Sequence, residues 1–262
     1  MRVAWTGDLH MGFWIEHEEA KFVHDVKKAH ADILLVAGDI AEARTIKKYL
    51  IHLSNLAQTV YFVLGNHDYY TGSIAETRKE VHAFLTTVPN LHWMNECGVV
   101  KLTPDVALIG HDGWADGRFG WYERSHVELN DFKYIKELKL FSKAERLYCM
   151  QSLANEAAEH FSKVLLETGW AKHIIVLTHV PPWDKATWHQ GQQSDGNYLP
   201  FFSSKVVGQV LESHMTEHLN QKMTVLCGHT HGGGKAQIAP NLVCLTGDSE
   251  YHNPKVEKTL EI

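Results

Sequence analysis

The residues best suited to bind metal ions occur in five short groups along the chain. These groups are Asp8-Leu9-His10, Gly38-Asp39, Gly65-Asn66-His67-Asp68, His179 and Gly228-His229-Thr230-His231. Imidazole and carboxylate ligands together suit a pair of divalent or trivalent metal ions, which commonly share at least one carboxylate. Such a pair activates water for hydrolysis. The pattern therefore predicts a two-metal centre.

The spacing within two of the groups suggests how their side chains are directed. We expect Asp8 and His10 to lie on an extended segment, where alternate side chains point the same way and can meet one metal together. His229 and His231 have the same spacing and can be divided between two metals. The glycines at positions 38, 65 and 228 would allow tight turns beside the ligands.

Each group follows an element that would position it. Apolar runs predict strands at 2–6, 33–37, 59–64, 173–178 and 223–227, and one group comes after each of them. Further strands are expected at 99–103 and 106–110, with two more within 235–246. Helical periodicity is expected at 16–30, 41–57, 72–87, 142–168 and 203–220. Because ligands of open α/β sheets bind beyond the carboxyl ends of the strands, all five groups are expected at one edge.

Each group taken alone has an ordinary structural explanation. Asn, His and Asp also form turns, and a lone pair of histidines can simply be solvated. The set is more informative than its members, because five separate strand-like segments each deliver a metal-binding side chain. Without a metal site, all five groups would independently have to be turns or solvated surface residues.

Composition limits the class of protein. The 262 residues are 44% hydrophobic with a formal charge of −6, which predicts a folded chain, and we expect a single domain over 1–262. The mild acidity argues against a dedicated nucleic-acid-binding surface. No apolar run approaches the ~20 residues that span a bilayer, and no signal peptide is recognisable. Four scattered cysteines indicate reduced thiols, so we expect a cytoplasmic protein.

Taken together, the five groups resemble the motifs of the calcineurin-like metallophosphoesterase superfamily, from residue 6 to residue 231. The resemblance implies an α/β fold, a four-layer α/β/β/α sandwich with two mixed sheets flanked by helices. It also implies two metal ions, and mixed nitrogen and oxygen ligands suit Mn, Fe, Zn, Co or Ni. The implied ligands are Asp8, His10 and His231 for the first metal, Asn66, His179 and His229 for the second, and Asp39 as the bridge.

The same resemblance implies roles for two residues that do not bind metal. A metal-bridging hydroxide would attack phosphorus in line, and His67 would assist the leaving group. Asp68 would hydrogen-bond His67 and fix its orientation. The expected activity is a phosphoester hydrolase, with a phosphodiesterase favoured. The alternatives are a phosphomonoesterase acting on a small metabolite and a non-catalytic metal-binding scaffold.

Some features of the sequence differ from those of better-known branches of the superfamily and argue against membership in these branches. The segment from Gly38 to Arg44 lacks the second-motif pattern of Ser/Thr protein phosphatases and the tyrosine ligand of purple acid phosphatases. About 30 residues after the last motif leave no room for the capping domain of the superfamily's repair nucleases. The chain looks like the small bacterial single-domain phosphoesterases, including cyclic-nucleotide phosphodiesterase-like members. A phosphoester small molecule or nucleotide is the implied substrate.

Two long loops, over 111–140 and 180–202, are expected to determine substrate choice. In the first, Arg118 can bind a phosphate oxygen, and Trp114 or Trp121 can stack on a base. The alternative is an aromatic minicore in which Arg118 pairs with Asp112 or Asp116. In the second loop, His189 is a candidate substrate-binding residue, and the alternative is a structural flap.

Overall fold

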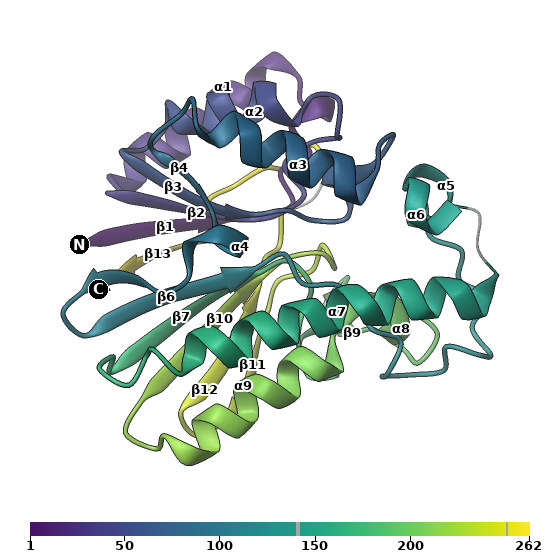
Figure 1. Cartoon of the computed structure of the whole chain (residues 1–262). Helices are drawn as coiled ribbons and strands as arrows, with labels where there is room; N and C mark the ends of the chain where they lie inside the picture. The colour runs from purple at the N-terminus through teal and green to yellow at the C-terminus, as the bar shows by residue number, and fades with distance from the viewer. Residues whose placement is uncertain (140–141, 250) are drawn as a thin grey trace.

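Two sheets lie face to face and carry helices on their outer surfaces (Figure 1). The coordinates are a computed structural model and describe residues 1–139, 142–249 and 251–262. The five-stranded sheet has the order β13-β1-β2-β3-β4, and the six-stranded sheet has the order β11-β12-β10-β7-β6-β5. This arrangement confirms the expected α/β fold with two mixed sheets flanked by helices.

The first sheet is parallel except at one edge. Its strands are β1 (Arg2–Thr6), β2 (Ile33–Ala37), β3 (Thr59–Val63), β4 (Leu91–Trp93) and β13 (Lys258–Glu261). Only β13 runs antiparallel, beside β1. Three helices cover the outer face: α1 (Glu16–Ala29), α2 (Ile46–Ser54) and α3 (Ile74–Leu85).

The second sheet is parallel in the middle and antiparallel at both edges. Its strands are β5 (Val100–Thr103), β6 (Val106–His111), β7 (His173–Thr178), β10 (Lys222–Cys227), β11 (Gly234–Ala239) and β12 (Leu242–Thr246). The helices α7 (Lys143–Leu165) and α9 (Lys205–Glu217) cover its outer face. Ser142 caps α7 in a capping box with Glu145, as its position predicted.

The alternation of side chains along each strand divides the core into layers. In β2, Leu34 and Val36 pack with the first helical layer, whereas Leu35 and Ala37 pack against the second sheet. All five residues of this strand are buried, as its continuous apolar run predicted. Because both faces are occupied, polar side chains gather beyond the strand ends.

Several elements differ from the expectation. The short strands β4 and β13 were missed because they contain three and four residues and lie at sheet edges. The first long loop contains the short helices α5 (Asp131–Tyr134) and α6 (Lys136–Lys139). Residue 140, at the end of this expected loop, lies outside the described residues, as does residue 141. The second contains the β8 (Trp188–His189) and β9 (Gln192–Gln193) hairpin and α8 (Leu199–Phe202). Over the described ranges, no helix is long and apolar enough to cross a membrane.

Candidate metal centre

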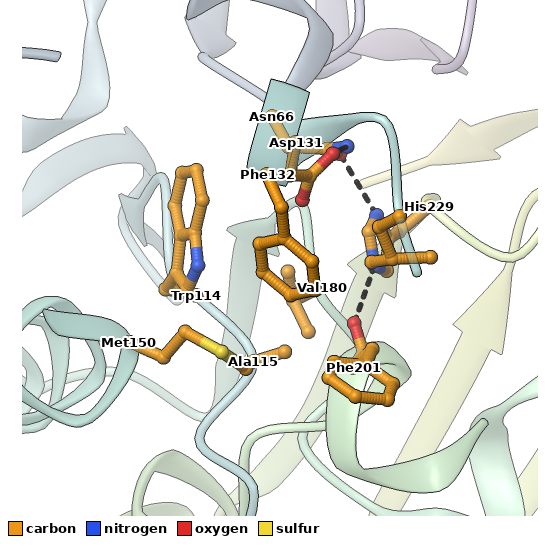
Figure 2. Close-up of a pocket in the computed structure, with 10 residues that line it drawn as sticks. Asn66, Trp114, Ala115, Asp131, Phe132, Met150, Val180, Phe201 and His229 are labelled. Carbon is orange, nitrogen blue, oxygen red and sulfur yellow. Dashed lines mark hydrogen bonds between the residues drawn. The ribbon is translucent and has the colours of Figure 1, made fainter. Parts of the chain in front are cut away.

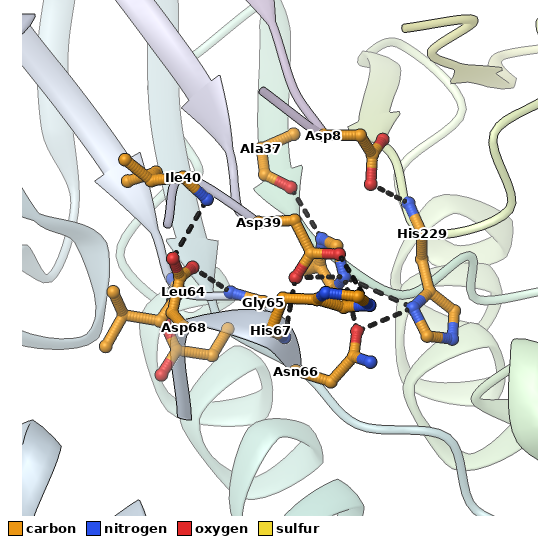
Figure 3. A network of polar contacts seen from close by, with 12 residues as sticks. Asp8, Ala37, Asp39, Ile40, Leu64, Gly65, Asn66, His67, Asp68 and His229 are labelled. Atoms are coloured by element: carbon orange, nitrogen blue, oxygen red, sulfur yellow. Dashed lines mark hydrogen bonds and ion pairs between the residues drawn. The ribbon is translucent and has the colours of Figure 1, made fainter. Parts of the chain in front are cut away.

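The loops after β1, β2, β3, β7 and β10 meet at one edge of the sandwich and bring all five sequence groups together (Figure 3). A first set of ligand atoms, from Asp8, His10, Asp39 and His231, lies within 4.8 Å of one another. The Nε2 atoms of His10 and His231 are 3.2 Å apart, and His10 Nε2 is 3.8 Å from Asp39 Oδ2. These four residues therefore form one candidate cation site.

A second set lies on the other side of Asp39. Asn66 Oδ1 is 3.1 Å from His179 Nε2 and 3.0 Å from His229 Nδ1. The same two imidazole nitrogens are 3.2 Å apart, and His179 Nε2 is 3.4 Å from Asp39 Oδ1. Asp39 thus presents one carboxylate oxygen to each set, which is the geometry of a bridging ligand.

The hydrogen bonds around the second set leave its lone pairs facing one another. His179 donates from Nδ1 to the carbonyl of Ala37 at 2.8 Å, and His229 donates from Nε2 to the carbonyl of Phe201 at 2.9 Å. Asn66 donates from Nδ2 to Asp131 at 2.8 Å. Each inward atom is consequently an acceptor, and no proton lies between them. Convergent acceptors without a donor are what a metal ion requires.

The carboxylates of the first set also favour a bound cation. Asp8 Oδ1 accepts from the backbone of His229 at 2.8 Å, but Asp8 Oδ2 is buried and has no hydrogen-bond partner among the described residues. Burial raises the pKa of the Asp8 carboxyl well above its usual range, and the charge of Asp39 raises it further. Burial also raises the pKa of Asp39. A metal ion would offset both effects and hold the carboxylates ionised.

The histidines of both sets are neutral near physiological pH. Burial lowers the pKa of His179 to about 4, of His229 to about 3 and of His231 to about 4. Burial, and then the charge of the neighbouring imidazole of His67, lower the pKa of His10 well below its ordinary value. Because neutral imidazole is the metal-binding form, these side chains are prepared to act as ligands.

The backbone at the ligands corrects one expectation. Asp8, His10, Asp39, His229 and His231 all have positive φ, between 44° and 74°, so Asp8 and His10 do not lie on an extended segment. β1 ends at Thr6, and the chain then turns through left-handed conformations that aim each side chain inward. Such residues cost about 1–3 kcal/mol each and persist only where the surroundings determine them, often at functional sites.

The expected glycines fit tightly beside the ligands. Gly38 has φ of 84°, and a Cβ there would lie 2.6 Å from His179 Nδ1. A Cβ on Gly65 would overlap the carboxylate of Asp39. Both positions therefore exclude a side chain because ligands occupy the space.

His67 lies at the rim and belongs to neither set. Its Nε2 is 4.0 Å from Asp39 Oδ2, and its Nδ1 is 3.3 Å from the hydroxyl of Tyr251. Its ring stacks on Tyr70 with centroids 4.1 Å apart. The burial of His67, followed by the charge of His231, lowers its pKa well below the ordinary value.

The expected contact between Asp68 and His67 is wrong for the described residues. Asp68 Oδ1 accepts from the backbone of Ile40 at 2.9 Å and of Ala41 at 2.8 Å, and its Oδ2 accepts from Gly65 at 2.8 Å. Asp68 therefore joins the loop after β2 to the loop after β3 (Figure 3). The turn at 67–69 directs the Asp68 carboxylate inward, where three unpaired backbone N–H groups need an acceptor.

Two residues proposed from the first long loop, Trp114 and Arg118, have different surroundings in the structure. Trp114 is 5% exposed and lines a cavity of about 10 Å³, which is no larger than one water site, together with Asn66 and His229 (Figure 2). Arg118 bonds Asp116 at 3.0 Å and Asn155 at 3.0 Å. The aromatic-minicore alternative, with Arg118 paired to Asp116, is therefore what the structure contains.

His189, in the second long loop, lies beside the metal centre. Its Nδ1 is 3.1 Å from the carbonyl of Thr230, between His229 and His231. It lines a cavity of about 480 Å³ together with Tyr198 and Phe202. The Phe202 ring makes an edge contact with His229, with centroids 5.3 Å apart. His189 therefore lies between the His229–His231 segment and this cavity.

Sequence reasoning missed three residues that contact the centre. Asp131 orients Asn66 and also accepts from the hydroxyl of Tyr70 at 2.6 Å. Tyr251 stacks on His10 with centroids 4.2 Å apart. Tyr70 lies two residues after Asp68 of the Gly65–Asp68 group, so its position was a signal, whereas Asp131 and Tyr251 lie in segments without periodicity.

Comparison with known proteins identifies relatives over nearly the whole chain. The family model for calcineurin-like phosphoesterases matches residues 1–233. The uncharacterized protein L509 of Acanthamoeba polyphaga mimivirus is 25% identical over 247 residues, which cover 87% of this chain and 83% of that protein.

Solved structures share the fold at low identity. Phosphopantetheinyl hydrolase (PptH) from Mycobacterium tuberculosis matches with a TM-score of 0.71 at 13% identity, over 95% of this chain and 89% of that one. A dimetal phosphatase from Danio rerio matches with a TM-score of 0.58 at 12% identity, over 94% and 86%. With the family match and the buried Asp and His cluster, the chain belongs to the calcineurin-like phosphoesterases, a family of metal-dependent hydrolases.

Proposed function

We propose that this chain is a phosphodiesterase with a dinuclear metal centre. The observation that carries the proposal is the pair of ligand sets that share Asp39, one carboxylate oxygen to each. Asp8, His10 and His231 would hold the first metal, and Asn66, His179 and His229 the second. When bound, the two metals would supply Lewis acidity to the phosphoryl group and to a nucleophilic water. Mn, Fe, Zn, Co and Ni all suit this mixture of ligands.

His67 is proposed to assist the leaving group. Its Nε2 faces the ligand sets, 4.0 Å from Asp39, without being part of either. When Nδ1 accepts a hydrogen bond from the Tyr251 hydroxyl, Nε2 carries the ring proton and can donate a hydrogen bond to the departing oxygen. The stack on Tyr70 holds the imidazole plane in this direction.

The charges around the centre support a diester rather than a monoester substrate. Two cavities open beside it, one of about 280 Å³ lined by His10 and His67 and one of about 480 Å³ lined by His189. Among the residues that the structure describes, no lysine or arginine lines either cavity, whereas Glu42 lines the first and Asp195 the second. A phosphodiester carries one negative charge and a monoester carries up to two, so the diester needs fewer cations here.

The extent and compartment of the enzyme are part of the same proposal. We treat residues 1–262 as one catalytic domain, because Asp8 near one end and Tyr251 near the other both contact the same centre. The four cysteines are free thiols, which supports a reducing, cytoplasmic environment.

The proposal is tested by a substrate comparison. The metal-stripped protein is reconstituted with Mn²⁺, and kcat/KM is measured on bis(p-nitrophenyl) phosphate and on p-nitrophenyl phosphate. A preference for the diester supports the proposal and makes cyclic nucleotides the first natural substrates to assay. A preference for the monoester would replace it with a small-metabolite phosphatase. Two bound metals without activity on either substrate would favour a metal-binding scaffold.

A further inference from the structure

A cationic cavity of about 620 Å³ lies next to the metal centre and is not part of it. Arg44, Lys133, Lys136 and Lys139 line it, together with the ring of Tyr134. The one acidic residue in its lining, Glu76, is 3.2 Å from Lys136. Within the described ranges, the other three cations have no carboxylate within 4.0 Å. Because the chain carries a formal charge of −6, this concentration of positive charge is local.

The cavity has a fixed backbone frame. Its lining comes from the segment after the His67 turn, from the α5–α6 segment and from Glu76 in the first turn of α3. Thr71 N donates to the carbonyl of Tyr134 at 3.0 Å, and Lys136 N donates to Gly72 at 3.1 Å. The carboxylate of Glu137 accepts from Ser73 Oγ at 2.7 Å and from the backbone at the first turn of α3. The cations are therefore presented by a hydrogen-bonded scaffold.

This cavity is connected to the metal centre through aromatic side chains. The ring of Tyr134 lies 5.5 Å from Tyr70, which in turn stacks on His67 at 4.1 Å. The loop that carries Arg44 also contributes Glu42 to the cavity beside His67. A single elongated ligand can consequently lie across this loop, with one end at the metal centre and the other among the cations.

We propose that the cationic cavity binds a phosphate group in addition to the phosphoester at the metal centre. The inference rests on the proposed phosphoesterase function. Arginine binds phosphate through paired N–H donors and lysine binds it as a point charge, so the set suits a group with several anionic oxygens. Tyr134, which is 48% exposed, offers a face to the organic part of the same molecule. The phosphate comes either from the substrate itself or from solution as a free effector.

The test compares two chromogenic diesters with the Mn²⁺-loaded enzyme. These are the p-nitrophenyl ester of thymidine 5′-phosphate, with and without a 3′-phosphate. We expect kcat/KM to favour the 3′-phosphorylated ester by about ten-fold, the effect of one charge-assisted contact. The double variant Lys133→Ala/Lys139→Ala should remove most of this preference. The matched control, Lys27→Ala/Lys28→Ala on α1, should keep it.

Inorganic phosphate separates the two sources. If the phosphate is an effector, adding it changes kcat for the unphosphorylated ester, and the double variant abolishes the change. If the phosphate belongs to the substrate, added phosphate raises the apparent KM by competition and leaves kcat unchanged. The proposal is overturned when wild-type enzyme shows neither a preference nor a phosphate effect, or when the double variant retains them in full.

Failure of the proposed function is recognised separately. If the metal-loaded protein hydrolyses neither ester, calorimetric titration with inorganic pyrophosphate replaces the kinetic assay. If the double variant binds one fewer equivalent of pyrophosphate than wild type, the proposed phosphate site in the cationic cavity is supported and the proposed hydrolase activity is contradicted. Equal binding in the two proteins would reject the site.

Discussion

The hydroxyl of Tyr251 lies 3.3 Å from Nδ1 of His67, the side chain that the family resemblance had paired with Asp68. Burial, with the nearby charges of Asp39 and Asp8, raises the pKa of the Tyr251 hydroxyl, so it stays protonated and can donate a hydrogen bond to Nδ1. The ring also stacks on His10 with centroids 4.2 Å apart. A residue from the last part of the chain thus contacts both the first ligand set and the proposed leaving-group histidine.

Tyr251→Phe removes this hydroxyl and keeps the ring. We expect kcat/KM to fall about ten-fold on a dinucleotide, whose alkoxide leaving group needs assistance, and to change little on bis(p-nitrophenyl) phosphate. Tyr251→Ala should in addition raise KM for both substrates, because the stacked ring is lost. An equal fall on both substrates in the Phe variant would show that the hydroxyl does not act through His67.

Substitutions in the two ligand sets are expected to remove different metal ions. His231→Ala removes a ligand from the first set only, and His229→Ala removes one from the second set only. Each variant should retain about one metal equivalent after dialysis, whereas Asp39→Asn should weaken both sites because its two oxygens serve different sets. Metal content measured by mass spectrometry checks this. Loss of both metals from either histidine variant would indicate a single cooperative site.

Asp68 is predicted to stabilise the fold rather than to assist His67. Its carboxylate accepts three backbone hydrogen bonds, and in Asp68→Asn one of these acceptors becomes a donor that faces a donor. We expect the free energy of unfolding, measured in urea without metal, to fall by about 2–4 kcal/mol. Asp25→Asn, which loses only an exposed contact to Lys21, is the control and should change little. A stable Asn variant with a selective defect on alkoxide leaving groups would restore the original expectation.

The positions of the ligands were predictable because each follows an apolar strand. Such a strand must end at the sheet edge, so Asp39 and His179 could be placed before the structure was known. The backbone conformation at Asp8 and His10 was not predictable. Left-handed backbone at non-glycine residues is unfavourable locally and arises from the surrounding contacts, which the local sequence does not encode.

The residues around the ligands were harder to predict for a related reason. Asp131 reaches Asn66 from a four-residue helix that has no periodicity to detect. Tyr251 reaches His67 from the segment after β12, whose carboxyl end lies at the edge with the site because β12 runs parallel to β10. In both cases the contact depends on long-range topology and not on local sequence.

Arg118 is predicted to matter for stability and not for substrate binding. It bonds the fully buried Asp116 at 3.0 Å, and that carboxylate also accepts from the backbone of Val206 at 2.9 Å. Arg118→Ala leaves the backbone bonds in place, so we expect a loss of about 1–2 kcal/mol in the free energy of unfolding with KM unchanged. Arg118→Lys should recover part of the stability. A rise in KM without a loss of stability would instead support a role for Arg118 in substrate binding.

His160 on α7 makes the folded state sensitive to acid. Its Nε2 is buried without a hydrogen-bond partner in the described part of the chain, and its ring lies 5.1 Å from that of His111. Burial, and then the charge of His111, lower the pKa of His160 to about 4, whereas in the unfolded chain it is about 6.5. As the pH falls below 6.5, the unfolded chain therefore binds a proton that the folded protein does not.

The stability contributed by this difference is fully present above pH of about 6.5 and is lost progressively toward pH of about 4. His160→Gln puts a neutral group on the helix and should show a smaller fall in the free energy of unfolding over that interval. Urea unfolding of both proteins at matched pH values measures the difference, and other titrating groups cancel because they are common to both. Parallel pH profiles would mean that His160 is protonated equally in the folded and unfolded states.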